Sequence, residues 1–182
     1  MTTLFTVGHG RRSLDEMIAV LRDAGVYILV DVRRFPGSRR YPHFARESLA
    51  VTLPDAGIEY QWWEELGGRR STQPNSRHTA LRNASFRAYA DHMDGAEFES
   101  AREALEALAR SRPAAVMCAE TLWWRCHRRH IADVMMLHGF EVTHLLDVGK
   151  SQPHKLHPAV RIGDNGRPVY DVSSSASRDE PP

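Results

Sequence analysis

Residues 114–132 read AAVMCAETLWWRCHRRHIA, and this stretch decides the fold that the sequence predicts. Its first four residues are apolar and follow Pro113, and a helical pattern of apolar residues begins toward its end. This arrangement is typical of a buried parallel strand that leads into a helix. In open α/β folds, ligands bind where such strands end, because helix N-termini supply backbone donors there. We therefore expect a functional site at this junction.

The same alternation of strand and helix runs through the rest of the chain. Apolar runs predict further strands at residues 4–7, 26–32, 58–62 and 140–146. Helical spacing predicts helices at residues 14–24, 45–54, 86–93, 96–110 and 124–138. The second strand is apolar almost throughout, which indicates burial on both faces. The sequence therefore predicts a three-layer α/β/α sandwich with a mostly parallel, Rossmann-like sheet.

One domain is expected to account for most of the 182 residues, because this length supports a sizeable core but is short for two domains. We expect the single α/β domain to span residues 1–150. Residues 151–182 are rich in Pro, Gly, Ser and His, and they are expected to form a partly disordered C-terminal extension. Within it, residues 169–172 would add an edge strand and residues 173–182 would be disordered.

Composition excludes several classes of protein. The net charge of +1 gives no global attraction to nucleic acids or membranes, so an anion must be bound by local clusters of charge. No apolar run approaches the roughly 20 residues of a membrane-spanning helix, and the first residues lack a signal-peptide pattern. Two cysteines make no disulfide framework, so we expect free thiols in a reducing cytoplasm. The sequence predicts neither a cofactor nor an oligomeric state.

Reactive side chains follow the strand at the centre of this pattern. Cys118 would end the strand close to a helix N-terminus and several arginines, a setting that lowers the pKa of a thiol and favours a nucleophile. Glu120 or His127 would then transfer protons. The alternatives are an inert buried cysteine, a glutamate that only interacts with the helix dipole, and a histidine bonded to a strand carbonyl at the edge of the core.

Arginines follow the ends of four predicted strands. The loop 33–40 carries four of them around a Pro-Gly turn, and Asp31, at the end of a buried strand, must pair with a cation such as Arg33. Because the carboxyl ends of parallel strands face one way, these loops would share one rim and clamp an anion. A solvated loop with a structural ion pair is the alternative. The residues expected to bind the substrate are His9, Asp31, Arg33, Ser38, Arg40, Cys126 and Arg128.

A glycine pair, Gly67 and Gly68, ends the third predicted strand and its following turn. Glycines permit left-handed backbone or the close approach of a ligand. The polar stretch from residue 69 to residue 83 that follows them is expected to be a long loop, and long loops in compact domains are often lids or binding loops.

Four motifs occur in a specific order. They are TVGHGRRSL at 6–14, LVDVRRFPGSRRYPHF at 29–44, IEYQWWEELGG at 58–68, and MCAE at 117–120 followed by CHRRHIA at 126–132. Together they resemble the bacterial and archaeal family of domains of unknown function numbered 488, over roughly residues 4–146. The resemblance implies a three-layer α/β domain and a shared site, but no reaction. The site that it implies comprises His9, Asp31, Arg33, Pro36, Ser38, Cys118, Glu120, Cys126, His127 and Arg128. Gly10 departs from the pattern, which has Ser there, and this removes a possible hydroxyl ligand.

The convergence of reactive groups with arginines predicts an enzyme that acts on a phosphorylated or nucleotide-like anionic substrate, with a Cys nucleophile and an arginine-rich clamp. One alternative is a non-catalytic nucleic-acid-binding module, in which the rim holds backbone phosphates. The tryptophans that would then stack on bases are Trp62, Trp63, Trp123 and Trp124. The other alternative is a metal or redox site built on Cys118 and Cys126. Because the chain lacks a paired motif such as C-x-x-C, no metal ligands are predicted.

Overall fold

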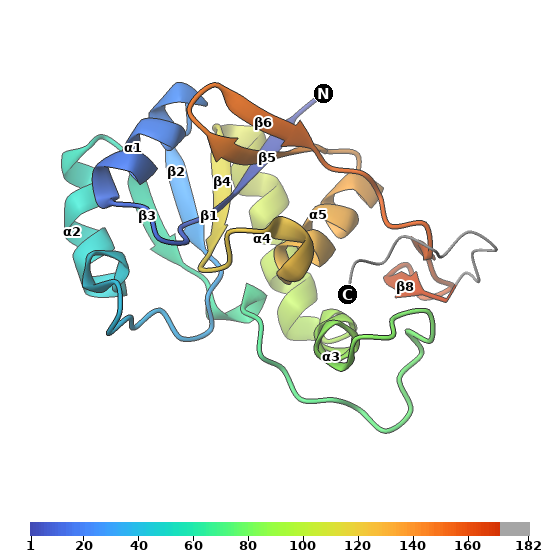
Figure 1. The fold of residues 1–182 in the computed structure, drawn as a ribbon. Helices are drawn as coiled ribbons and strands as arrows, with labels where there is room; N and C mark the ends of the chain where they lie inside the picture. The colour runs from blue at the N-terminus through green and yellow to red at the C-terminus, as the bar shows by residue number, and fades with distance from the viewer. Residues whose placement is uncertain (172–182) are drawn as a thin grey trace.

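Six strands form the central sheet of the protein (Figure 1). The structure is a computed structural model, and it describes residues 1–171. The strands are β1 (Thr3–Gly8), β2 (Ile28–Asp31), β3 (Glu59–Trp62), β4 (Ala114–Cys118), β5 (Glu141–Asp147) and β6 (Lys150–Pro153). Their order is β3-β2-β4-β1-β5-β6, and all neighbours are parallel except β5 and β6. The strand that opens the decisive stretch, β4, therefore lies between β2 and β1 in the middle of the sheet.

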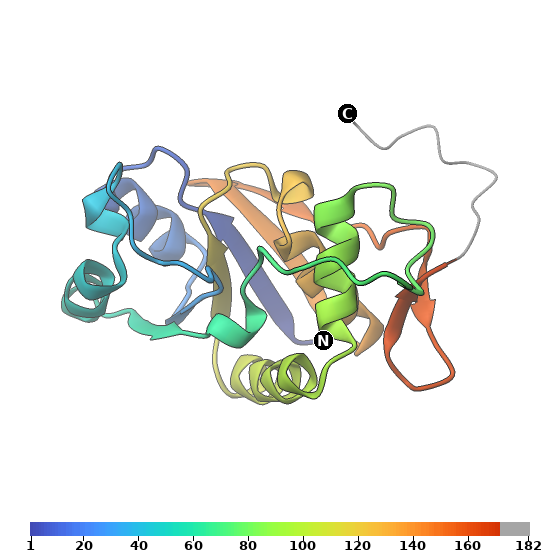
Figure 2. The same cartoon turned by 90° about the horizontal axis from the view of Figure 1, so that it is seen from below.

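Helices cover both faces of this sheet (Figures 1 and 2). They are α1 (Leu14–Asp23), α2 (Arg46–Asp55), α3 (Ala84–Met93), α4 (Ala96–Ser111) and α5 (Arg128–Leu137). Met17 of α1 and Leu49 of α2 pack into one core, whereas Tyr89 of α3, Leu105 of α4 and Ile131 of α5 share the other. The predicted three-layer α/β/α fold is confirmed. None of these helices is long and apolar enough to cross a membrane.

Alternation along β4 assigns its side chains to the two cores. Ala114 and Val116 face the core of α3, α4 and α5, and Ala115 and Met117 face the core of α1 and α2. All four are fully buried, as expected for a central strand of a parallel sheet. Because side chains alternate with a period of two, Cys118 points to the same face as Val116, against the α5 side.

The helix after β4 begins later than predicted. The sequence analysis placed its start at residue 124, but residues Trp123–Arg125 form a separate 3₁₀ turn, η3, and α5 begins at Arg128. Cys126 between them has extended backbone, with φ −124° and ψ 150°. The Trp123 ring stacks on His144 of β5, with ring centroids 4.1 Å apart, and this contact ties the turn to the sheet.

The C-terminal part of the described chain differs from the prediction. The edge strand expected at residues 169–172 is β8 (Pro168–Tyr170), and it pairs with β7 (Val160–Ile162) in a separate hairpin rather than with the sheet. The true antiparallel edge strand is β6, which the sequence analysis missed because its residues, KSQP, show no apolar alternation. Residues 173–182, which were predicted to be disordered, lie outside the described residues.

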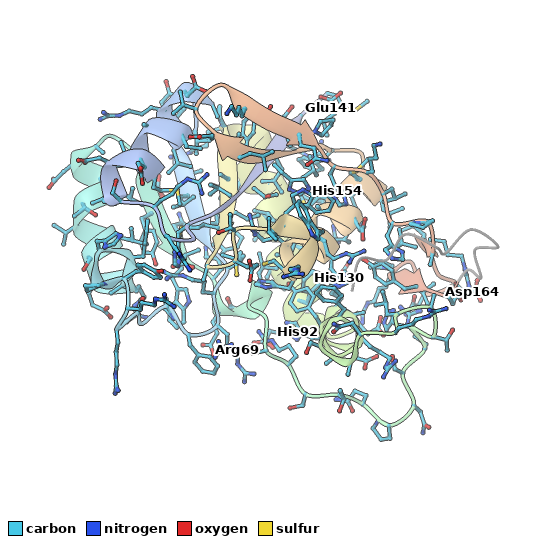
Figure 3. The ribbon with its side chains drawn as sticks, viewed as in Figure 1. Arg69, His92, His130, Glu141, His154 and Asp164 are labelled. Carbon is cyan, nitrogen blue, oxygen red and sulfur yellow. The ribbon has the colours of Figure 1, made fainter. Side chains whose placement is uncertain are left out.

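A buried carboxylate anchors residues 150–171 to α5. Asp133 is fully buried and accepts hydrogen bonds from His154 Nε2 at 2.8 Å, from the His157 backbone at 2.9 Å and from the Tyr170 hydroxyl at 2.8 Å. His154, labelled in Figure 3, lies where the chain leaves β6 and passes α5. The fold therefore includes structured residues well beyond position 150.

Candidate functional site

The carboxyl ends of the three middle strands carry most of the predicted site. In the sheet, Asp31 of β2 lies beside Met117 of β4, and Gly8 of β1 lies beside Cys118. Pairing continues past the strands, because Val32 donates to the Met117 carbonyl and His9 donates to the Cys118 carbonyl, both at 2.9 Å. The loops that follow β1, β2 and β4 are therefore held close together, as the parallel topology requires.

Two sulfurs and one imidazole nitrogen meet on the α5 side of this edge. His127 Nδ1 lies 3.9 Å from Cys118 Sγ and 3.6 Å from Cys126 Sγ. Both cysteines are free thiols, with Cys118 partly exposed and Cys126 buried. We call Cys118, Cys126 and His127 the cysteine–histidine cluster. The sequence placed these residues in the site but did not predict that the two sulfurs approach one imidazole.

The orientation of His127 in this cluster is fixed by the sheet. Its Nε2 lies 2.9 Å from the carbonyl oxygen of Val32, which can only accept a hydrogen bond. Nε2 therefore carries the proton in the neutral ring, and the Nδ1 lone pair faces the two sulfurs. A hydrogen bond to a carbonyl, foreseen as the alternative for this residue, is present with Val32 just after β2, and the same bond leaves the Nδ1 lone pair directed at the sulfurs.

Arg128 joins the cluster to the loop after β4. Its backbone N and its Nε lie 3.5 and 3.4 Å from Cys126 Sγ, and its guanidinium also donates to the carbonyl oxygen of Glu120. The side chain is 1 % exposed. Gly8 makes room for it, because a Cβ there would lie 2.8 Å from the guanidinium and 2.0 Å from the Glu120 oxygen. Arg128 is thus bound internally and is not the open anion clamp that the sequence suggested.

The surroundings of the two thiols favour deprotonation of Cys126 and disfavour that of Cys118. A hydrogen bond with Cys126 and burial raise the pKa of Cys118 well above its usual value. Burial would also raise the pKa of Cys126, but the Cys118 thiol, His127 and Arg128 lower it to well below its usual value. The expected lowering of the Cys118 pKa was therefore wrong. Its premise failed because α5 starts too late to present its N-terminus to Cys118, and the donors of Arg128 reach Cys126 instead.

A second group of charged residues lies at the same sheet edge but on the α1 and α2 side. Asp31 accepts hydrogen bonds from Arg33 Nε at 2.8 Å, from Arg33 Nη2 at 2.5 Å and from the Tyr60 hydroxyl at 2.6 Å. Arg33 Nη2 also donates to the Phe44 carbonyl at 2.8 Å. Asp31 is fully buried and Arg33 is 6 % exposed. The predicted ion pair is present, and it engages most of the guanidinium internally.

His9 completes this second group as a neutral ring. It stacks on Phe44 with centroids 4.4 Å apart, and its Nδ1 donates to the Gly10 carbonyl at 3.0 Å. Nε2 is then an acceptor, and Nη1 of Arg33 points to it from 3.5 Å. Burial lowers the pKa of His9 to about 4. His9 therefore positions Arg33 at neutral pH and carries no charge of its own.

The lowered pKa of His9 predicts that the fold weakens in mild acid. Between its ordinary value of 6.5 and its folded value of about 4, the unfolded chain binds a proton that the folded chain does not. The contribution of the neutral His9 to the unfolding free energy is complete above pH 6.5. As the pH falls toward 4, the unfolding free energy should decrease by up to about 3 kcal/mol. Urea unfolding at several pH values measures this slope. A His9→Gln variant should show a shallower slope, because the contribution of His9 is removed while other groups, such as His144 with a pKa lowered to about 3, still contribute.

Three predicted residues lie in loops, and within residues 1–171 no hydrogen bond joins their side chains to the cluster, although the Glu120 backbone forms a hydrogen bond with Cys118. The Glu120 carboxylate is exposed and accepts a hydrogen bond from the Leu122 backbone at 3.3 Å, so its carbonyl, not its side chain, contacts Arg128. Ser38 Oγ accepts from the Tyr41 backbone at 2.9 Å, and Arg40 lies over the Tyr41 ring at 5.5 Å. Within residues 1–171, no contact joins Ser38 or Arg40 to the cysteines.

The turn after β3 borders the cluster through residues that are not among the predicted site residues. A Cβ at Gly68 would lie 2.8 Å from His127 Nδ1, so this glycine borders the cluster directly. The next residue, Arg69, has φ +56° and is the one residue other than glycine with positive φ in residues 1–171. Arg34 Nη1 donates to its carbonyl at 2.7 Å. The glycine pair indicated a close approach here, but nothing in the sequence indicated that Arg69 adopts the left-handed backbone.

The tryptophans are engaged within the protein. Trp62 donates to the Arg33 carbonyl at 2.8 Å and lies under the guanidinium of Arg46 at 4.5 Å. Trp63 donates to Gln61 at 2.9 Å. Trp123 stacks on His144, and Trp124 meets Trp123 edge to face. These contacts explain the two tryptophan pairs by packing and hydrogen bonding.

Comparison with known proteins identifies the family of this chain but indicates no reaction. Neither the curated proteins nor the solved structures include a match to this chain. A family model described as "Domain of unknown function DUF488" matches residues 13–135, which is more than half of the chain and includes β2, β3, β4 and most of α5. The resemblance carried by the sequence motifs is thereby confirmed, and the chain belongs to the DUF488 family.

Proposed function

We propose that this chain is an enzyme that acts on a substrate with a phosphate or another anionic group, such as a nucleotide. Its reacting centre is the cysteine–histidine cluster, and Arg34 and Arg69 bind the anionic group beside it. Both cysteines are free, so we also propose the reducing cytoplasm as its compartment. The observation that carries the proposal is the left-handed backbone of Arg69 one residue from the glycine that borders His127 Nδ1.

Left-handed backbone is costly at arginine. A residue with a Cβ pays roughly 1–2 kcal/mol for this conformation, and such residues cluster at functional sites where the surroundings enforce them. At Arg69 the carbonyl is held by Arg34, while the side chain is exposed and makes no hydrogen bond or ion pair within residues 1–171. The strained residue thus carries an unpaired guanidinium one residue from Gly68, which borders the cluster, and an unpaired guanidinium is what a bound anion requires.

Arg34 offers a second donor at the same place. Its Nη1 is used by the Arg69 carbonyl, but its Nε is buried and lacks a hydrogen-bond partner within residues 1–171. The nearest carboxylate oxygen, of Glu64, is 4.0 Å from this nitrogen and is too distant for a hydrogen bond. A buried unpaired donor of this kind is costly unless a ligand satisfies it. Arg34 and Arg69 therefore replace Arg33, Arg40 and Arg128 in the proposed anion site.

The cluster supplies the reactive groups. Cys118 is its partly exposed member and marks the side from which a substrate approaches. His127 presents an unprotonated Nδ1 there, so it can accept a proton, and Gly68 adds no side chain that would block the approach. Cys118 and His127 thus remain the proposed catalytic residues, but because the pKa of Cys118 is raised, His127 would have to accept the thiol proton before the sulfur attacks. Glu120 contributes through the loop that its carbonyl fixes.

An Arg69→Gly variant separates binding from stability. Glycine adopts the left-handed backbone without strain, so the variant should be more stable than the natural chain by about 0.5–1 kcal/mol. Loss of the guanidinium should weaken binding of inorganic pyrophosphate by roughly 10-fold or more. Calorimetric titration of the metal-free protein and urea unfolding measure the two effects.

An Arg82→Ala variant is the matched control, because Arg82 is also exposed and makes no polar side-chain contact within residues 1–171. Its affinity for pyrophosphate should equal that of the natural chain. Unchanged binding in the Arg69→Gly variant would overturn the proposed anion site.

A further inference from the structure

We propose that Cys118, Cys126 and His127 bind one Zn²⁺ ion, or a divalent ion with the same preference for sulfur and nitrogen, through the two Sγ atoms and Nδ1. The inference rests on the proposed function in taking the same cluster as the reacting centre, but it assigns the Cys118 thiolate and the His127 Nδ1 lone pair to the ion, so that the bound ion rather than these two side chains would activate the reacting group. Binding of the ion can be measured without any assay of activity.

The spacing of the three atoms fits a tetrahedral ion. All three lie within 4.8 Å of one another, and Nδ1 is 3.9 and 3.6 Å from the two sulfurs. Zinc bonds of about 2.3 Å to sulfur and about 2.05 Å to nitrogen imply sulfur–nitrogen edges of roughly 3.6 Å and a sulfur–sulfur edge of roughly 3.8 Å. The side chains therefore need only small movements to bind an ion between them.

A hydrogen bond at Nε2 of His127 holds the imidazole in the tautomer and the direction that a metal at Nδ1 needs. Histidines that bind metals usually donate their other ring N–H to a carbonyl or carboxylate, which fixes the tautomer and the ring direction. His127 does this with the Val32 carbonyl, at 2.9 Å. Its unprotonated Nδ1 faces both sulfurs, an arrangement that a simple disulfide between Cys118 and Cys126 does not require.

Donors around Cys126 suit a bound thiolate. The backbone N and Nε of Arg128 lie 3.5 and 3.4 Å from its Sγ. A positive charge and N–H groups directed at sulfur stabilise the deprotonated form, which is the form that binds metal. The buried guanidinium also compensates part of the negative charge that two thiolates bring to the site.

Three protein ligands leave one position of a tetrahedral ion open, as in catalytic zinc sites. Cys118 is partly exposed, so this position faces the solvent side of the cluster. Gly68 adjoins Nδ1, and Arg69 follows it. An anionic substrate held by Arg69 would reach the open position, which links the metal to the proposed substrate class.

A second group of possible ligands serves as a contrast. His78, Asp91 and Asp94 also lie within 4.8 Å of one another. However, His78 Nδ1 accepts a hydrogen bond from the Tyr170 backbone at 3.3 Å, so Nε2 carries the proton and donates to Asp94 at 3.0 Å. Both histidines carry the ring proton on Nε2, but the Nδ1 lone pair of His78 already accepts from the Tyr170 backbone. Of the two groups, only the cysteine–histidine cluster therefore offers a metal a nitrogen lone pair that no N–H group occupies.

The test uses the full chain, purified without a histidine tag, stripped of metal and titrated with Co²⁺ or Zn²⁺. Thiolate-bound Co²⁺ absorbs in the near ultraviolet by charge transfer, and its visible bands report four-coordination. We expect one equivalent to bind with both signals. Cys118→Ser, Cys126→Ser and His127→Gln should each weaken binding by at least about 10-fold. Gly68→Ala should also weaken it although every ligand remains, because its Cβ would crowd Nδ1.

The control variant is His92→Gln. His92 likewise donates through Nε2 to a backbone carbonyl, that of Glu65 at 2.6 Å, but has no cysteine beside it, so binding should not change. Iodoacetamide labelling of the natural chain, read by peptide mass spectrometry, does not depend on the folding of any variant, since Zn²⁺ should protect the partly exposed Cys118. Absence of the charge-transfer band, no protection by Zn²⁺, or full binding in a folded His127→Gln variant would overturn the metal site.

Failure of the metal site and failure of the proposed function give different results. If Co²⁺ does not bind but Arg69→Gly still weakens pyrophosphate binding, only the metal inference fails. If Co²⁺ binds as expected but Arg69→Gly leaves pyrophosphate binding unchanged, the ion is present and the proposed anion site is wrong.

Discussion

An Asp31→Asn variant is expected to lose about 3–5 kcal/mol of unfolding free energy, because it leaves the buried Arg33 without its counter-charge. The carboxylate is fully buried and accepts from Arg33 and from the Tyr60 hydroxyl, so asparagine removes the charge and reverses part of the hydrogen bonding. A loss of this size is a large fraction of the stability of an ordinary domain. Urea unfolding monitored by circular dichroism measures it.

Glu59→Gln provides the comparison for an exposed pair. Glu59 accepts from Arg112 at 2.6 Å, but both side chains are more than 40 % exposed, so this change should cost less than about 1 kcal/mol. If Asp31→Asn were as mild as Glu59→Gln, the Asp31–Arg33 pair would not be the structural element that we describe.

A Gly8→Ala variant is expected to lose at least about 3 kcal/mol of unfolding free energy, which is at the upper end of the range for overpacking. Its Cβ would lie 2.0 Å from the Glu120 carbonyl oxygen and 2.8 Å from the Arg128 guanidinium. Arg128 donates a hydrogen bond to that oxygen, so neither group can move away from the Cβ without breaking this bond. The loop after β4 must then shift, and Cys126 with it. Thermal unfolding and the reactivity of the two thiols measure the consequences.

Gly37→Ala is the matched control, because a Cβ at position 37 meets no atom within 4 Å and the glycine does not have positive φ. This change should be neutral or stabilising by about 0.4–1 kcal/mol. A Gly8→Ala protein with natural stability and natural thiol reactivity would mean that the close packing of β1 against the Glu120 loop is not needed.

The elements that the sequence predicted well are those that local pattern determines. The parallel strands are short apolar runs, and the start of α1 shows both hydrogen bonds of a capping box, from Glu16 N to Ser13 Oγ and from Ser13 N to Glu16 Oε2. The ion pair of Asp31 and Arg33 also follows locally, because alternate residues of a strand share a face. β6 could not be found in this way, since backbone pairing with β5 alone defines it.

The arrangement of the candidate site depends on loops that local pattern does not determine. Cys118 and Cys126 meet only because the η3 turn brings the chain back, and that turn is held by the stacking of Trp123 on a distant strand. The sequence likewise shows where the arginines are, but not which groups accept their hydrogen bonds. Backbone carbonyls of Phe44 and Glu120 engage Arg33 and Arg128, and backbone acceptors have no signature in a sequence.

Neither of the two free arginines could be singled out from the sequence. Arg69, labelled in Figure 3, lies on the chain that leaves η2 (Glu64–Leu66). Its importance comes from a backbone conformation and from Gly68, which contacts an imidazole almost sixty residues further along the chain. Arg34 was one of four arginines in a single loop, and only its unpaired Nε distinguishes it.

The most direct test of an anion site beside the reactive cluster is a nuclear magnetic resonance titration of metal-free, ¹⁵N-labelled protein with inorganic pyrophosphate. We expect saturable shifts of the Arg34 and Arg69 side-chain Nε signals and of the backbone amides of Gly68 and Cys118. Shifts confined to other arginines, such as the exposed Arg161 of β7, or no saturable shift at all, would contradict the account.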